Sequence, residues 1–167
     1  MTTTLPQGLE QLGYGSGFHA TLCEMLEAIP MFADLPRREI EMLAGYVGAY
    51  TARPGTVIFN EGGHSNYLCF ITAGKLEVLK EQREHERRRI AEIRAGKPIG
   101  EMAFVDKQPH SANVVARTEA TLLLFTQNGF ERLSEEHPRL ALKLAWRLCE
   151  QLSHRLRQTS GQLVDFL

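Results

Sequence analysis

Residues 99–114 read IGEMAFVDKQPHSANV, and this stretch decides how the rest of the chain is interpreted. Gly100 has no Cβ, so a ligand can approach its backbone closely. If a short helix opens at Glu101, its free N–H groups favour an anion. Ser111 can donate its hydroxyl to a phosphate-type oxygen. The stretch therefore predicts a cradle for an anionic ligand.

Short apolar segments separated by Gly and Pro lie on both sides of this stretch, from about residue 48 to residue 126. Short strands at this spacing are typical of an antiparallel sandwich or jelly roll. The predicted strands cover residues 50–53, 56–59, 67–71, 75–80, 89–94, 113–116 and 122–125.

Helical periodicity frames the β region. We predict helices over residues 19–29, from Pro36 to Val47, shortly before Pro138, and over about 138–158. The last of these is long and carries leucines four residues apart: Leu140, Leu144, Leu148, Leu152 and Leu156. The expected fold class is α+β and mainly β, an eight-stranded antiparallel β-roll or jelly roll with N-terminal helices and a long C-terminal helix.

The length of 167 residues suits one domain with short tails. Residues 1–17 are rich in glycine and poor in large apolar side chains, so we expect a flexible N-terminal tail. The domain is expected over residues 18–160, followed by a C-terminal tail at 161–167. Hydrophobic residues make up 43% of the chain, which is enough for a core and excludes global disorder.

Three motifs in this order resemble the cyclic-nucleotide-binding domain family: residues 54–62 its first turn and strand, residues 70–78 its central hairpin, and residues 99–114 its phosphate-binding cassette. The resemblance covers about residues 29–158. It implies cAMP or cGMP as ligand, no required cofactor, and a Glu101 that accepts the ribose 2′-hydroxyl. The implied ligand-binding residues are Gly100, Glu101, Met102, Ala103, His110, Ser111, Ala112 and Val114.

One position departs from the family pattern, which puts Arg where this chain has His110. Arg offers a permanent charge and a two-pronged contact to phosphate, whereas a free histidine is mostly neutral at pH 7. Three interpretations stay open. The pocket is vestigial and the domain acts through protein contacts, or it binds a cyclic mononucleotide weakly, or it takes a larger or less charged nucleotide.

Catalysis is not expected. A metal-dependent β-roll enzyme needs two nearby histidines, and no two of the six histidines here lie within four positions of each other. The three cysteines are too few and too scattered for a disulfide framework, so we expect reduced thiols and a cytoplasmic protein. We also expect the protein to be bacterial. Cys69 and Cys149 lie in apolar segments and are expected to be buried and inert.

The expected partners follow from charge and from the long helix. A net charge of -1 disfavours nucleic acid, and too few residues follow the long helix for the helix-turn-helix that bacterial transcription factors of similar fold carry there. We therefore expect no DNA, and the basic residues of the helix are expected to face solvent. No apolar run is long enough for a membrane helix. The leucine stripe favours a protein partner or a homodimer through the 138–158 helix.

Overall fold

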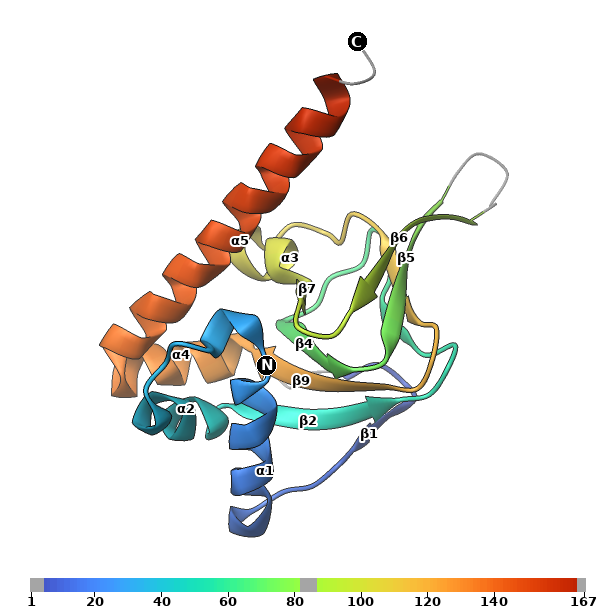
Figure 1. The fold of residues 1–167 in the computed structure, drawn as a ribbon. Coiled ribbons are helices and arrows are strands. Elements are labelled where there is room, and N and C mark those ends of the chain that lie inside the picture. Colours follow the sequence, from blue (N-terminus) through green and yellow to red (C-terminus); the bar gives the residue numbers. More distant parts are fainter. Residues whose placement is uncertain (1–4, 82–86, 165–167) are drawn as a thin grey trace.

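The computed structural model describes residues 5–81 and 87–164, which form two antiparallel sheets and the helices that cover one end of them (Figure 1). One sheet has the order β1-β2-β9-β4-β7 and the other has the order β3-β8-β5-β6. The first contains β1 (Leu9–Gln11), β2 (Val47–Ala52), β9 (Ala120–Thr126), β4 (Tyr67–Ala73) and β7 (Pro98–Ile99). The second contains β3 (Val57–Phe59), β8 (Asn113–Ala116), β5 (Lys75–Glu81) and β6 (Arg87–Arg94).

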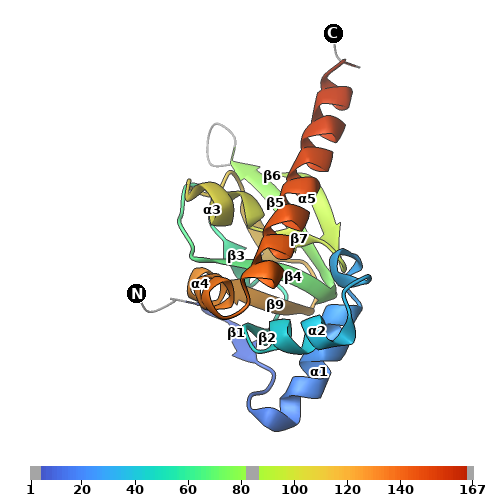
Figure 2. The ribbon, with the colours of Figure 1, turned by 90° about the vertical axis from the view of Figure 1, so that its left-hand side faces the viewer.

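The helices gather around one end of this β-roll (Figure 2). They are α1 (Ser16–Glu27), the 3-10 turn η1 (Pro30–Phe32), α2 (Arg37–Ala44), α3 (Glu101–Asp106), α4 (Gln127–Glu136) and α5 (Pro138–Val164). The short helix α3 lies between the roll and α5, and α5 continues well past the body of the domain (Figure 1).

Alternation along the central strands builds two cores. Phe70 and Phe125 face the helices and join the helical core, where Phe32 meets Phe70 edge-on with ring centres 5.1 Å apart. Their neighbours Ile71 and Leu124 point to the other face and fill the inside of the roll. This period of two fixes the register of the strands, because a slip of one residue would exchange the two faces.

The predicted β-roll with N-terminal helices and a long C-terminal helix is confirmed, with one difference in strand number. The described residues contain nine strands where eight were expected. β1 and β7 are the short strands that none of the seven predicted residue ranges covers. The prediction of a flexible tail over residues 1–17 is wrong for Leu9–Gln11, which pairs with the edge of β2. Its middle residue Glu10 also pairs with Arg53 of the neighbouring turn.

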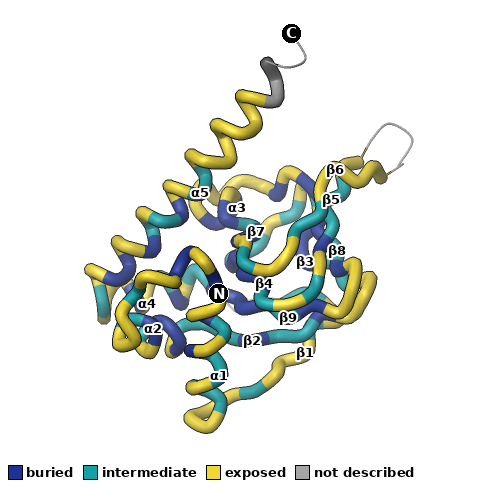
Figure 3. Tube along the Cα trace, viewed as in Figure 1, coloured by how far each residue is buried: buried dark blue, intermediate teal, exposed yellow. Residues whose placement is uncertain are grey.

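The long helix differs from the prediction in two ways. It continues to Val164, so the expected tail at 161–167 is helical in part, and residues 165–167 lie outside the described residues. Its leucine stripe divides: Leu144 and Leu148 are buried against the domain, whereas Leu156 is 68% exposed. Figure 3 shows that buried positions occur along the part of α5 beside the domain, while the projecting part is mostly exposed. Among the described residues, no helix combines the length and the apolar character that a membrane span requires.

Candidate functional site

The turn from β7 into α3 brings backbone close to an aromatic side chain. Gly100 has φ +78°, in the left-handed region that glycine adopts without strain. A Cβ at this position would lie 2.5 Å from Cζ of Phe59. Because no larger residue fits there, Gly100 allows the start of α3 to pack against β3 and closes one side of a cavity.

This cavity has a volume of about 220 Å³ and lies between α3, the strands β3 and β8, and α5. The structure brings all eight predicted ligand-binding residues to its walls: Gly100, Glu101, Met102, Ala103, His110, Ser111, Ala112 and Val114. Ala103, Ala112 and Val114 are buried in the walls, and Met102 is half-exposed at the rim. Their binding role stays a prediction, but they form one site.

Glu101 is the most deeply buried charged group of the cavity, with 2% of its surface exposed. Its carboxylate accepts a hydrogen bond from the guanidinium of Arg155, which reaches in from α5. Arg155 also approaches the carbonyl oxygen of Pro98 at 3.5 Å. Burial raises the pKa of Glu101, and the charge of Arg155 opposes that shift. The carboxylate thus has a partner, and the partner belongs to the chain itself.

His110 lies inward on the opposite wall and is 8% exposed. Its ring packs over Phe59 with ring centres 4.2 Å apart, and its Nε2 lies 2.8 Å from Oγ of Ser65. The Ser65 hydroxyl donates its one proton to the carbonyl oxygen of Tyr67 at 3.2 Å, so Nε2 of His110 is the donor to Ser65. Burial lowers the pKa of His110, and the nearby His64 lowers it further. The imidazole is therefore neutral at pH 7.

Lys80 of β5 links Ser111 to the turn before β4. Nζ of Lys80 donates to the carbonyl oxygen of Ser111 at 2.6 Å and also pairs with Glu61. The backbone N–H of Glu61 donates to Oδ1 of Asn113 at 3.0 Å. These contacts tie the loop after α3 to β5 and leave the side chain of Ser111 exposed.

Two sequence expectations about side chains are wrong. Arg155 was placed on a solvated helix face, yet it lines the cavity. It extends the buried side of α5, since Leu144, Leu148, Gln151 and Arg155 follow one another at helical spacing, and this signal could have revealed it. Cys149 was expected to be buried, but it is exposed because it lies on the side of α5 that faces away from the core.

The other arginines near the roll do not reach the cavity. Arg94 and Arg117 both pair with Glu92 of β6, at 3.0 Å and 2.7 Å. Within residues 5–81 and 87–164, no three side chains of His, Cys, Asp or Glu gather closely enough to hold a metal ion. Arg155 is therefore the cation that the described part of the chain presents to this cavity.

Comparisons with known proteins agree with this geometry. The sequence model of the cyclic nucleotide-binding domain matches residues 51–137, just over half of the 167 residues. The chain is 29% identical over 108 residues to a cAMP-dependent protein kinase regulatory subunit of Yarrowia lipolytica, which covers 65% of this chain and 28% of that protein. It is 29% identical to Glutaminase 1 of Bradyrhizobium diazoefficiens, which covers 100% of this chain and 27% of that protein.

The chain spans less than a third of the length of both relatives. Solved structures also match most of the chain. A cyclic nucleotide-binding domain from Methylobacillus flagellatus superposes with a TM-score of 0.81 and 27% identity, covering 96% of this chain and 90% of that one. The catabolite activator protein of Thermus thermophilus superposes with a TM-score of 0.69 and 26% identity, covering 82% and 62%. This chain belongs to the cyclic nucleotide-binding domain family, a family of regulatory binding domains.

Proposed function

We propose that this chain is a regulatory domain in which a cyclic nucleotide, cAMP or cGMP, enters the cavity beneath α3 and thereby moves the distal half of α5. The single observation that carries the proposal is the contact between Glu101 and Arg155. The carboxylate that the family resemblance assigns to the ribose hydroxyl is bound by a residue of α5. The ligand and the helix therefore compete for one group.

The size of the cavity supports a mechanism in which the ligand displaces Arg155, rather than one in which it binds beside Arg155. Its volume of about 220 Å³ lies below the about 300–1,000 Å³ that is usual for sites of small molecules. Arg155 is part of its wall, so its departure would enlarge the site. An uncompensated buried carboxylate is costly, so only a ligand that offers Glu101 a hydroxyl donor can replace the guanidinium.

The exchange would act on α5 because Arg155 anchors its distal half. Residues 153–161 of the helix are exposed, so this part of α5 does not lie in the core. Short isolated helices are marginally stable in water, so this half would fray or reorient once Arg155 is released. A ligand can shift α5 only by the difference of its affinities for the two states.

A second function, a ligand-free scaffold or protein-interaction domain of the same fold, is favoured by a different observation. The cassette position that the family fills with Arg holds the neutral His110, so a phosphate would find no cation there. In both cases the role that we propose is regulatory and not catalytic, without DNA. A cytoplasmic location and a bacterial origin stay predictions.

Protonation of His110 would supply the missing charge, so binding of cAMP is expected to tighten as the pH falls. The pKa of His110 in the free domain is lowered, whereas a bound phosphodiester favours the charged ring, and binding then takes up a proton. We expect affinity to rise between pH 7.5 and pH 6, by at most about tenfold for each pH unit. Calorimetry at both pH values measures this.

The matched control for the pH experiment is His110→Gln, whose affinity should be flat over the same range. Glu101 and Asp106 also line the cavity and are unchanged in this variant, so whatever they contribute is common to both proteins. Equal affinity of the wild-type protein at pH 7.5 and pH 6 would show that His110 does not carry charge to the ligand.

The exchange itself is tested by Arg155→Gln, with Arg157→Gln as a control that removes an equal charge from the exposed face of α5. Because the Arg155 side chain is half-exposed, its contact with Glu101 is worth only about 1 kcal/mol after solvent screening. Removing this competitor should tighten cAMP binding about fivefold in a calorimetric titration. Arg157→Gln should leave it unchanged.

The possible results separate the two functions. Loss of binding in Arg155→Gln would mean that the guanidinium contacts the nucleotide directly, and the proposed competition would be wrong. No heat with cAMP or cGMP in the wild type or in Arg155→Gln would overturn nucleotide sensing and favour the scaffold.

A further inference from the structure

A second cavity opens between α3, α4 and α5, where these three helices meet (Figure 2). We call it the helix cavity, and the lining residues that matter here are Phe104, Lys107, Phe130, Glu131, Leu148 and Cys149. Its volume of about 350 Å³ lies within the about 300–1,000 Å³ that is usual for sites of small molecules. Although α3 borders both cavities, the helix cavity shares no lining residue with the proposed nucleotide site. A ligand here would therefore be distinct from the nucleotide.

The inner wall of the helix cavity is apolar and largely aromatic. Phe104 and Phe130 line it, with their rings nearly perpendicular and their centres 6.0 Å apart. Leu148 and the small Ala145 complete the wall from α5. Phe130 is only partly buried, so its ring has surface left to cover. Because aromatic rings pair favourably edge to face at such distances, the wall suits an apolar group and best of all another ring.

Two opposite charges lie at the rim of the helix cavity. Lys107 follows the end of α3 and Glu131 lies on α4, and both side chains are exposed. Within residues 5–81 and 87–164, neither charged group has an ion pair or a hydrogen bond, with the other or with any third residue. The rim therefore offers one free cation and one free anion beside an apolar wall.

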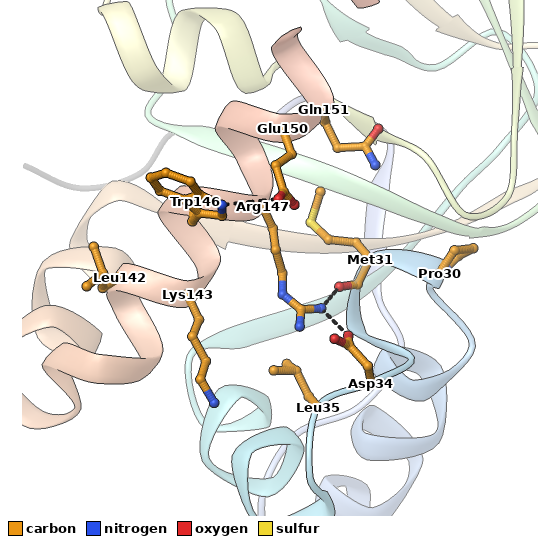
Figure 4. A pocket seen from close by; sticks show the side chains of 10 residues that line it. All are labelled: Pro30, Met31, Asp34, Leu35, Leu142, Lys143, Trp146, Arg147, Glu150 and Gln151. Carbon is orange, nitrogen blue, oxygen red and sulfur yellow. Dashed lines mark hydrogen bonds and ion pairs between the residues drawn. The ribbon is translucent and has the colours of Figure 1, made fainter. Parts of the chain in front are cut away.

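A larger groove on the other side of α5 differs in this respect. It has a volume of about 790 Å³ and lies between α5 and the η1 turn. Arg147 crosses it, donates to the carbonyl oxygen of Met31 and pairs with Asp34 at 2.7 Å (Figure 4). Glu150 accepts the indole N–H of Trp146 at 3.1 Å. The charged groups of that groove are satisfied within the domain, so they make no demand for a ligand.

The wall and the rim of the helix cavity together define the kind of ligand. A molecule with a carboxylate alone would gain Lys107 but meet the negative charge of Glu131, and a molecule with an amine alone would meet the converse. An α-amino acid carries both charged groups on one carbon atom, and its side chain leaves from the same atom. The two charged groups can thus stay at the rim while an apolar side chain enters the cavity.

We infer that the helix cavity is a second ligand site, for an α-amino acid with an apolar and preferably aromatic side chain. The carboxylate of the ligand lies at Lys107, its ammonium group at Glu131, and its ring against Phe104 and Phe130. Burial of the ring supplies most of the affinity. The charge contacts are exposed to solvent, so each contributes up to about fivefold in affinity and acts mainly on selectivity.

The first test is a calorimetric titration of the nucleotide-free protein with three probes that share one ring. They are phenylalanine, 3-phenylpropionate, which lacks the ammonium group, and phenethylamine, which lacks the carboxylate. Phenylalanine is expected to bind about fivefold more tightly than either of the others. Glycine, which keeps both charges but has no ring, should give no measurable heat. Equal affinity of the three probes would contradict the assignment to amino acids, and no binding of any would overturn the site.

The second test assigns the rim charges. Glu131→Gln should bind phenylalanine and 3-phenylpropionate equally, because the group that selects the ammonium is gone. Glu135→Gln is the matched control, since Glu135 is exposed on the same helix but does not line the cavity, and it should keep the preference. Lys107→Gln should likewise lose the preference over phenethylamine. A preference that survives in Glu131→Gln and in Lys107→Gln would show that the rim does not select the ligand.

The third test places the ligand in the helix cavity. Cys149 lines this cavity and is exposed, whereas Cys23 and Cys69 are buried. Its thiolate attacks the disulfide DTNB, forms a mixed disulfide and releases one coloured thiolate. Saturating phenylalanine should slow this reaction several-fold, and glycine at the same concentration should not. An unchanged rate with phenylalanine bound would mean that the ligand lies elsewhere.

These results are independent of nucleotide sensing. Every measurement is made without nucleotide, so failure of the amino acid to bind leaves the proposed function standing. Failure of cAMP and cGMP to bind, in turn, leaves the helix cavity as a ligand site.

Discussion

His110→Arg is expected to strengthen binding of cAMP by about ten- to a hundredfold. In the structure the imidazole is buried, neutral and turned to Ser65, so the cavity offers no permanent cation from the loop after α3. A guanidinium at this position can make two charge-assisted hydrogen bonds to a phosphate. Such bonds contribute about 1.5–3 kcal/mol, which corresponds to the stated gain. Calorimetry at pH 7.5, where histidine is neutral, measures it.

The control for this variant is His64→Arg, which adds the same charge near His110 but outside the walls of the cavity. A general attraction of the anion by positive charge would strengthen binding equally in both variants. If His110→Arg brings no more gain than His64→Arg, the cavity lacks the phosphate position that the family resemblance assigns to it. Circular dichroism of both variants checks that the fold is retained.

Gly100→Ala is expected to destabilise the domain and to weaken nucleotide binding together. At φ +78° a side chain costs about 1–2 kcal/mol, and the added Cβ would press on Phe59, which supports the ring of His110. Overpacking of this kind adds about 1–3 kcal/mol. Urea unfolding should show the summed loss of about 2–5 kcal/mol, and calorimetry a lower affinity for cAMP.

Gly55→Ala separates the two costs. Gly55 has φ +87°, so alanine meets a comparable backbone penalty there, but a Cβ would have no atom within 4 Å. It should lose only the about 1–2 kcal/mol of the backbone and keep its affinity. Equal stability of the two variants would mean that Phe59 yields freely, and that the approach of α3 to β3 is not tightly constrained.

Much of the fold could be predicted from local signals. Gly and Pro punctuate the strands, and the resemblance of three ordered motifs sets their arrangement. The shortest strands escaped prediction, because a three-residue strand such as Leu9–Gln11 has no detectable period and owes its place to pairing with β2. The glycines around it suggest a loop until that tertiary partner is known.

The site was predictable where its residues are consecutive and not where they come from a distant helix. The eight cassette residues meet in one cavity because α3 and the following loop fold locally. Arg155 joins them only through the packing of α5 across the domain, which brings residues 54 positions apart into contact. The neutrality of His110 likewise depends on burial and on the nearby His64, and a sequence pattern shows neither effect.

The most direct test of the account is hydrogen exchange along α5 in His110→Arg, with and without saturating cAMP. If the nucleotide takes Glu101 from Arg155, amides of residues 153–161 should exchange at least several-fold faster when cAMP is bound, while those around the buried Leu144 keep their protection. Unchanged exchange beyond Leu152 in a protein that has bound cAMP, or no binding of cAMP by this variant, would contradict the account.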